Sequence, residues 1–93
     1  MDFQHVTGKN AGHIVLYALS TCPWCHKTKA LLDSLGIDYS YIYVDLLSKE
    51  DKDTAMQTIE KFNPRISFPS LVINNKEYII GFQEDKIRNT LKT

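Results

Sequence analysis

The only two cysteines of the chain lie in one tetrapeptide, Cys22-Pro23-Trp24-Cys25. A disulfide between them would close so short a loop that it would remove little entropy from the unfolded chain. A purely structural bridge is therefore a poor explanation for the pair. Two thiols at this spacing suit reversible chemistry instead, in which the pair alternates between a dithiol and a disulfide.

The segments on either side of the tetrapeptide predict how it is presented. Residues 13–19 form a continuous apolar and aromatic run, which is typical of a buried strand. Ser20 offers a hydroxyl for capping, and Pro23 suits the first turn of a following helix. Cys22 would then lie at the amino end of that helix, where unpaired amides and the helix dipole favour a thiolate. We expect Cys22 to attack a substrate disulfide and the deeper Cys25 to resolve the mixed disulfide.

Periodicity along the rest of the chain predicts the elements that hold this site. A helix over about 23–35 and a strand over 39–45 complete a βαβ unit with parallel strands. The remaining expected elements are a second helix from about Ser48 to Phe62, strands at 68–73 and 76–80 joined by the turn Asn74-Asn75, and a short helix over 83–91. This order, βαβ-α-ββ-α, predicts an α/β fold with a four-stranded mixed sheet flanked by three helices.

Length and composition limit the function classes. With 93 residues we expect one domain, residues 13–93, preceded by a loosely held N-terminal arm at residues 1–12. The formal net charge is zero, so neither nucleic acid nor an anionic membrane is the expected partner. We find neither a secretory leader pattern nor an apolar run long enough to cross a bilayer, and therefore expect a cytoplasmic location.

Three short motifs together resemble a known family. They are Thr21-Cys22-Pro23-Trp24-Cys25 with basic residues after it, Ser67-Phe68-Pro69 before the hairpin, and Gly81-Phe82 followed by Asp85. In this order, across about residues 13–91, they resemble the glutaredoxins and the related redoxins associated with ribonucleotide reductase.

The resemblance implies a thioredoxin-like fold and a dithiol–disulfide oxidoreductase that acts on protein or small disulfides without a bound cofactor. It implies that Cys22 and Cys25 are catalytic and that the substrate contacts Ser67, Phe68, Pro69, Gly81, Phe82 and Asp85. Pro23 pre-sets the helical φ, and Trp24 offers a flat apolar surface on which the sulfur or peptide of a partner could rest, so we expect both to contact the substrate, although both also suit a merely structural role. The resemblance also implies that Pro69 is cis and faces the dithiol, and that disulfide-containing proteins, including ribonucleotide reductase, are the partners. We expect a monomer.

Two positions depart from the family pattern for glutathione binding. Leu19 stands where glutaredoxins have a basic residue, and Phe82 stands where they have a second glycine. The missing cation removes a charge-assisted contact worth roughly 1.5–3 kcal/mol. Glutathione, a flavoprotein thioredoxin reductase and a ferredoxin-linked reductase all stay open as the external electron donor.

Other readings of the same residues compete with this one. Cys22 to His26 also fits the CxxCH pattern of c-type haem attachment, which would require export and a mostly helical chain. A zinc site lacks a second pair of ligands, so we predict no metal site, although an iron–sulfur cluster shared between subunits stays open. A non-catalytic adaptor would have no need for both cysteines.

Several residues also have simpler structural roles. We expect His26 to be a solvated first-turn residue and Asp85 either to cap the last helix or to bind a ligand. Tyr39, Tyr41 and Tyr43 share one strand face by alternation and are expected to pack against the sheet.

Overall fold

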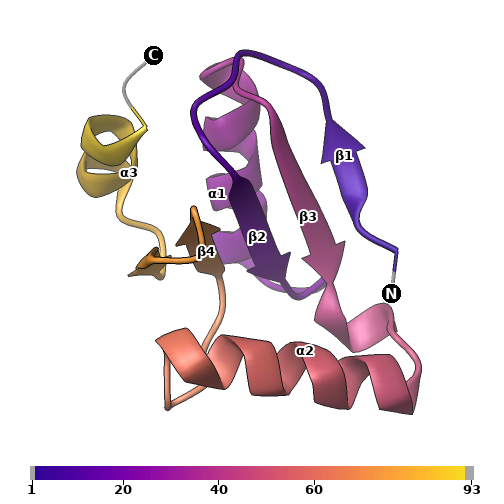
Figure 1. Cartoon of the computed structure of the whole chain (residues 1–93). Helices are drawn as coiled ribbons and strands as arrows, with labels where there is room; N and C mark the ends of the chain where they lie inside the picture. Colours follow the sequence, from indigo (N-terminus) through magenta and orange to yellow (C-terminus); the bar gives the residue numbers. More distant parts are fainter. Residues whose placement is uncertain (1, 92–93) are drawn as a thin grey trace.

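The computed structural model describes residues 2–91 and contains five strands and three α-helices (Figure 1). Met1, Lys92 and Thr93, the ends of the expected arm and domain, lie outside the described residues. The elements are β1 (Gln4–Val6), β2 (Ile14–Ala18), α1 (Pro23–Ser34), β3 (Tyr39–Tyr43), a 3-10 turn at Val44–Leu46, α2 (Lys49–Phe62), β4 (Ser70–Ile73), β5 (Glu77–Ile80) and α3 (Glu84–Thr90).

The strands form one mixed sheet in the order β1-β3-β2-β4-β5. Strands β2 and β3 are parallel and joined through α1, whereas the other three pairings are antiparallel. All five residues of β2 are buried, because this strand lies at the centre of the sheet and both of its faces are covered. The predicted α/β fold class, with a mixed sheet flanked by three helices, is confirmed.

Two hydrophobic clusters lie on opposite faces of the sheet. On one face, alternate residues of β2 pack against α1 and α3, through side chains such as Leu16, Leu32 and Ile87. On the other face, Val15 and its neighbours pack against Ile59 and other residues of α2. In Figure 1, α1 accordingly lies behind the sheet, and α2 runs across its lower end. The carboxyl end of β2 leads directly to the start of α1, which fixes the place of the cysteine pair.

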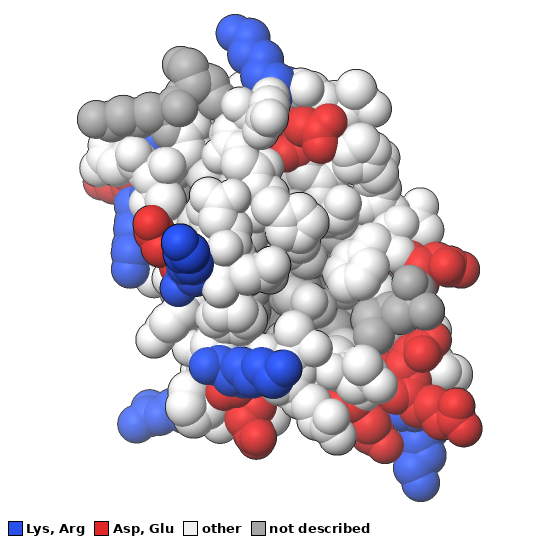
Figure 2. Space-filling model, in the orientation of Figure 1, with Lys and Arg blue, Asp and Glu red and all other residues white. Residues whose placement is uncertain are grey.

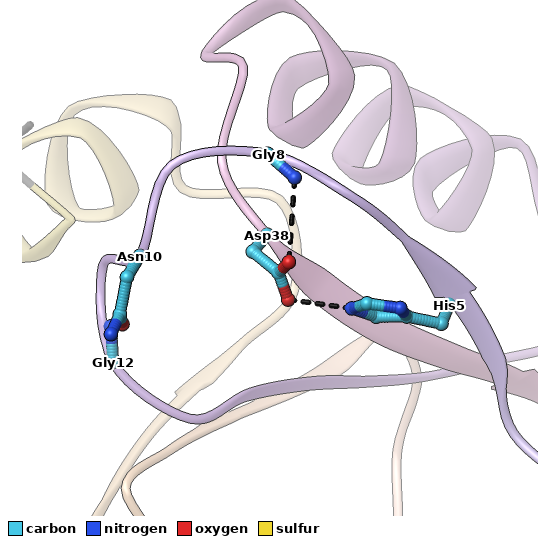
Figure 3. A network of polar contacts seen from close by, with 5 residues as sticks. All are labelled: His5, Gly8, Asn10, Gly12 and Asp38. Carbon is cyan, nitrogen blue, oxygen red and sulfur yellow. Dashed lines mark hydrogen bonds and ion pairs between the residues drawn. The ribbon is translucent and has the colours of Figure 1, made fainter.

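The predicted number of strands is wrong by one, because residues 1–12 contain β1. This strand pairs with β3 through His5 opposite Ser40 and its neighbours. Within β1, an imidazole nitrogen of His5 lies 2.6 Å from a carboxylate oxygen of Asp38, and beyond the strand the Gly8 amide donates to the other oxygen at 3.4 Å (Figure 3). Lys9 also exchanges backbone hydrogen bonds with the Gly36–Asp38 segment. The arm therefore supplies an edge strand of the sheet, β1.

Most other elements agree closely with the sequence pattern. Asn74 and Asn75 both have φ of 55° and connect β4 to β5, as expected for a tight hairpin. The rings of Tyr41 and Tyr43 are in edge contact at a centroid distance of 5.5 Å, and both rings pack against the cluster under α1. The predicted packing role of these tyrosines is confirmed.

Acidic and basic side chains are mixed on the face of the molecule that Figure 2 shows. Figure 2 shows them along the rim of one face, around a centre that carries no charged side chain. The whole sequence contains 11 Lys and Arg against 11 Asp and Glu. No helix within residues 2–91 has the length and apolar character needed to cross a bilayer.

Candidate active site

Cys22 occupies the N-cap position of α1. Its backbone is extended, with φ of −93° and ψ of 113°, and Pro23 begins the helix. The Cys25 amide donates to the Cys22 sulfur at 3.2 Å, and the His26 amide donates to the Cys22 carbonyl at 3.1 Å. The expected hydroxyl cap is therefore wrong, because the sulfur itself accepts the capping hydrogen bond. The thiol is half-buried and lies at the helix terminus, where the sequence placed it.

Cys25 lies one turn farther into α1 and is 1% exposed. Both cysteines are free thiols in this structure. Burial, followed by a hydrogen bond to Cys22 that the Cys25 thiol donates, raises the pKa of Cys25 to about 12. At neutral pH Cys25 is therefore a protonated thiol next to a more accessible sulfur. The two positions differ in the way that a nucleophile and a resolving thiol must differ.

Asp45 fastens the turn before Cys22, a role that the sequence analysis missed. Its carboxylate accepts the Ser20 amide at 2.8 Å and the Ser20 hydroxyl at 2.5 Å. These hydrogen bonds lower the pKa of Asp45. The signal was the parallel pairing of β2 and β3, since Ser20 and Asp45 each lie two residues beyond the carboxyl end of one of these strands.

His26 is held by the same turn. Its ring nitrogen lies 2.7 Å from the Ser20 carbonyl oxygen, and its ring lies 6.2 Å from the Tyr43 ring. The residue is exposed, as expected for a first-turn position. The haem alternative required a mostly helical chain, and the five-stranded sheet contradicts it.

A groove of about 270 Å³ is lined by Trp24, Phe68, Pro69, Gly81 and Phe82. Three segments form it: the start of α1, the loop before β4 and the turn after β5. The Phe68–Pro69 peptide bond is cis, as the resemblance implied. The Gly81 amide donates to the Pro69 carbonyl at 2.9 Å, which ties two of these segments together. The fold thus brings five of the expected substrate-contact residues into one groove.

The other expected contact residues lie outside this lining. Pro23 is exposed in the first turn of α1. Ser67 is exposed, its hydroxyl accepts from the Asn63 side chain at 2.8 Å, and its carbonyl accepts from the Ser70 hydroxyl at 2.6 Å. Asp85 is exposed in the first turn of α3, but the N-cap of this helix is Gln83, so a capping role for Asp85 is wrong.

The side chain of Leu19 packs with the cluster under α2, on the sheet face opposite to the cysteines. This position therefore presents an apolar side chain where the family pattern has a cation. Within residues 2–91, no three His, Cys, Asp or Glu side chains converge in a group that could hold a metal ion.

Comparison with known proteins agrees with the geometry. The sequence pattern of the Glutaredoxin family matches residues 14–79. A 62-residue stretch is 37% identical to Glutaredoxin 1 of Rickettsia prowazekii and covers 67% of this chain and 62% of that relative. The matched region thus spans less than two thirds of this relative's own length.

Two solved structures are similar over the whole chain. The glutaredoxin of Methanosarcina mazei superimposes with a TM-score of 0.93 at 43% identity, covering 100% of this chain and 90% of that one. The methanoredoxin of Methanosarcina acetivorans gives a TM-score of 0.94 at 45% identity, with coverage of 100% and 97%. With the family match, the shared fold and the cysteine pair at the start of α1, the chain belongs to the glutaredoxin family.

Proposed function

We propose that this protein is a thiol–disulfide oxidoreductase in which Cys22 is the nucleophile and Cys25 is the resolving thiol. The observation that carries the proposal is the unequal placement of the two sulfurs. Cys22 is partly accessible at the N-cap of α1 with an amide donating to it, whereas Cys25 is buried one turn deeper. A substrate disulfide can reach the Cys22 sulfur directly. The buried Cys25 sulfur can then react with the mixed disulfide that forms on Cys22.

The reaction transfers two electrons. The Cys22 thiolate attacks one sulfur of the substrate disulfide, the substrate S–S bond breaks, and the first substrate thiolate leaves. Cys25 then loses its proton and attacks the Cys22 sulfur of the mixed disulfide, which releases the second substrate thiolate. The substrate gains two electrons and two protons, and the protein is left with a Cys22–Cys25 disulfide. In the dithiol protein, burial raises the pKa of Cys25, so this thiol is protonated before the substrate arrives.

Two matched variants test these roles, because each replaces one sulfur by oxygen. Cys22→Ser should abolish reduction of a disulfide-bonded peptide, whereas Cys25→Ser should accumulate a mixed disulfide that mass spectrometry detects as a mass increase. Full turnover by the Cys22→Ser protein would overturn the assignment. A stable mixed disulfide on Cys25 in the Cys22→Ser protein, with none on Cys22 in the Cys25→Ser protein, would mean that the two roles are reversed.

We further propose that the electron donor is a reductase protein, either a flavoprotein thioredoxin reductase or a ferredoxin-linked reductase, in preference to glutathione. Support comes from Leu19, which lacks the positive charge of the family pattern, and from Phe82, which fills a position that a glycine would leave open. The oxidised protein should be offered each of the three donors at equal reducing equivalents, with recovery of the thiols measured over time. Fastest recovery with glutathione would contradict the proposal.

Protein disulfides, including that of a ribonucleotide reductase, are the proposed substrates. We propose that the protein acts as a monomer in the cytoplasm, where the thiol pool is reducing. Pro23, Ser67 and Asp85 lie outside the groove lining, and we propose that they contact the parts of a large substrate that extend beyond it. Sedimentation with and without an oxidised substrate protein would test the oligomeric state and the complex.

A further inference from the structure

The groove next to the cysteine pair is uncharged and aromatic. Trp24, Phe68, Pro69, Gly81 and Phe82 line it, and none of these residues carries a charge. Cys22 and Phe82 pack against the same hydrophobic cluster, so the reactive sulfur lies on the side of the sheet on which Phe82 lines the groove, whereas Phe68 contacts the clusters of both faces. Trp24 lies between the two cysteines in the sequence, so a group that enters this groove meets aromatic side chains next to the segment that carries out disulfide exchange.

Two aromatic rings from distant parts of the chain form one wall. The rings of Trp24 and Phe82 are stacked, with centroids 6.0 Å apart and an interplanar angle of 26°. The Lys27 ammonium lies 4.5 Å from the centroid of the Trp24 ring and steadies the indole, which is otherwise 55% exposed. Because the rings already contact each other, a ligand gains from them without having to order them first.

The lining distinguishes between two kinds of disulfide. Glutathione carries two carboxylates and an ammonium group at neutral pH, and the five lining residues offer these charges no ionic partner. The Lys27 ammonium next to the Trp24 ring can compensate one carboxylate at most. An apolar or aromatic side chain has no such penalty and gains from burial against the rings. A polypeptide chain also supplies such a side chain next to its cysteine, which glutathione does not.

We propose that the Trp24–Phe82 pair is a specificity determinant that selects polypeptide disulfides with an apolar or aromatic residue next to the reacting cysteine. This inference rests on the proposed role of Cys22 as nucleophile. The pair holds the neighbouring side chain of the substrate in the groove while the Cys22 sulfur attacks the substrate disulfide. Electrons and protons move as in the general reaction, and the pair itself takes no part in bond making.

The test uses pre-reduced protein and single-turnover kinetics, so that no electron donor is needed. The probes are glutathione disulfide and two symmetrical peptide disulfides that differ only in the residue after cysteine, which is Phe in one and Ser in the other. The expected result is a rate constant for the Phe peptide about 10-fold or more above those for the Ser peptide and for glutathione disulfide.

Two variants and one control assign this preference to the pair. Phe82→Gly should bring the Phe-to-Ser ratio close to one and should raise the relative rate with glutathione disulfide. Trp24→Ala provides a second route, because this exposed ring can be removed without opening the core. The control is Tyr78→Ala, which removes another exposed aromatic ring, on β5, that does not line the groove; it should keep the wild-type ratio.

Three outcomes are distinguishable. A wild-type ratio near one overturns the specificity proposal while Cys22-dependent reduction keeps the proposed function intact. A high ratio that persists in both Phe82→Gly and Trp24→Ala also overturns it, because the selectivity then lies elsewhere. Absence of reaction with all three disulfides would overturn both proposals.

Discussion

Asp45 accepts two hydrogen bonds from Ser20, one from its amide and one from its hydroxyl, although 25 residues separate the two in sequence. The contact joins the end of β3 to the turn that presents Cys22. It therefore couples the carboxyl edge of the parallel strand pair to the reactive loop.

Replacing Ser20 by alanine should destabilise the protein by about 1–2 kcal/mol, since one hydrogen bond to a carboxylate is lost and the backbone bond stays. Urea unfolding of Ser20→Ala and wild type measures this difference. Because the pKa of Asp45 is lowered in the folded protein, its contribution is complete above the ordinary value of about 3.9 and disappears as pH falls through the lowered value. The difference between the two proteins should therefore shrink in acid. A difference that grows towards low pH would contradict the role of the carboxylate.

The two thiols should react very differently with an alkylating agent. The pKa of Cys25 is raised to about 12, chiefly by burial, so this thiol is almost entirely protonated at pH 7, and it is also inaccessible. Limited iodoacetamide treatment of the reduced protein, followed by peptide mass spectrometry, should find the label on Cys22 at least 100-fold more often. Equal labelling of both cysteines under native conditions would mean that Cys25 is neither buried nor protonated as described.

Gly8 should be intolerant of any side chain. A Cβ at this position would lie 2.5 Å from the Gly36 carbonyl oxygen and 2.5 Å from the Ile37 carbonyl carbon, and these backbone atoms cannot move aside cheaply. Gly8→Ala should therefore release the arm and speed hydrogen exchange at the Lys9 and Asp38 amides, which now donate to Gly36 and Lys9 respectively.

Gly36→Asn is the matched control for that experiment. Gly36 has φ of 66° with open space around its Cα, and asparagine tolerates this left-handed conformation. Exchange at the two reporter amides should stay slow in the control. Slow exchange in Gly8→Ala as well would show that the arm does not depend on this close approach.

The contact between His5 and Asp38 should respond to acid (Figure 3). The hydrogen bond from His5 is the largest cause of a lowered pKa at Asp38, so its stabilising effect is present above about 3.9 and is lost as pH falls through the lowered value. His5→Ala should move the pKa of Asp38 back towards its ordinary value, as measured by NMR titration of the carboxyl carbon. Since both side chains are exposed, melting at neutral pH should hardly change. An unchanged titration of Asp38 would refute the contact.

Much of the fold could be predicted because its signals are local. Periodicity in apolar residues located β2, α1, α2 and the hairpin to within a few residues, and the Asn74-Asn75 pair predicted the turn between β4 and β5. Strand β1 escaped because Gln4–Val6 is short and mostly exposed, and its extended conformation depends on the free edge of β3. A strand whose extended conformation depends on pairing with a neighbour has no clear pattern of apolar residues in its own sequence.

The sequence by itself determined the chemistry of the site: two thiols three positions apart, at the junction between a buried strand and a helix. Local hydrogen bonding and helical spacing are enough to set that arrangement. Only the tertiary structure decided which side chains surround the pair. The Ser20–Asp45 contact and the Trp24–Phe82 wall join residues far apart in the chain, and such contacts arise from sheet order and packing, which no short pattern encodes.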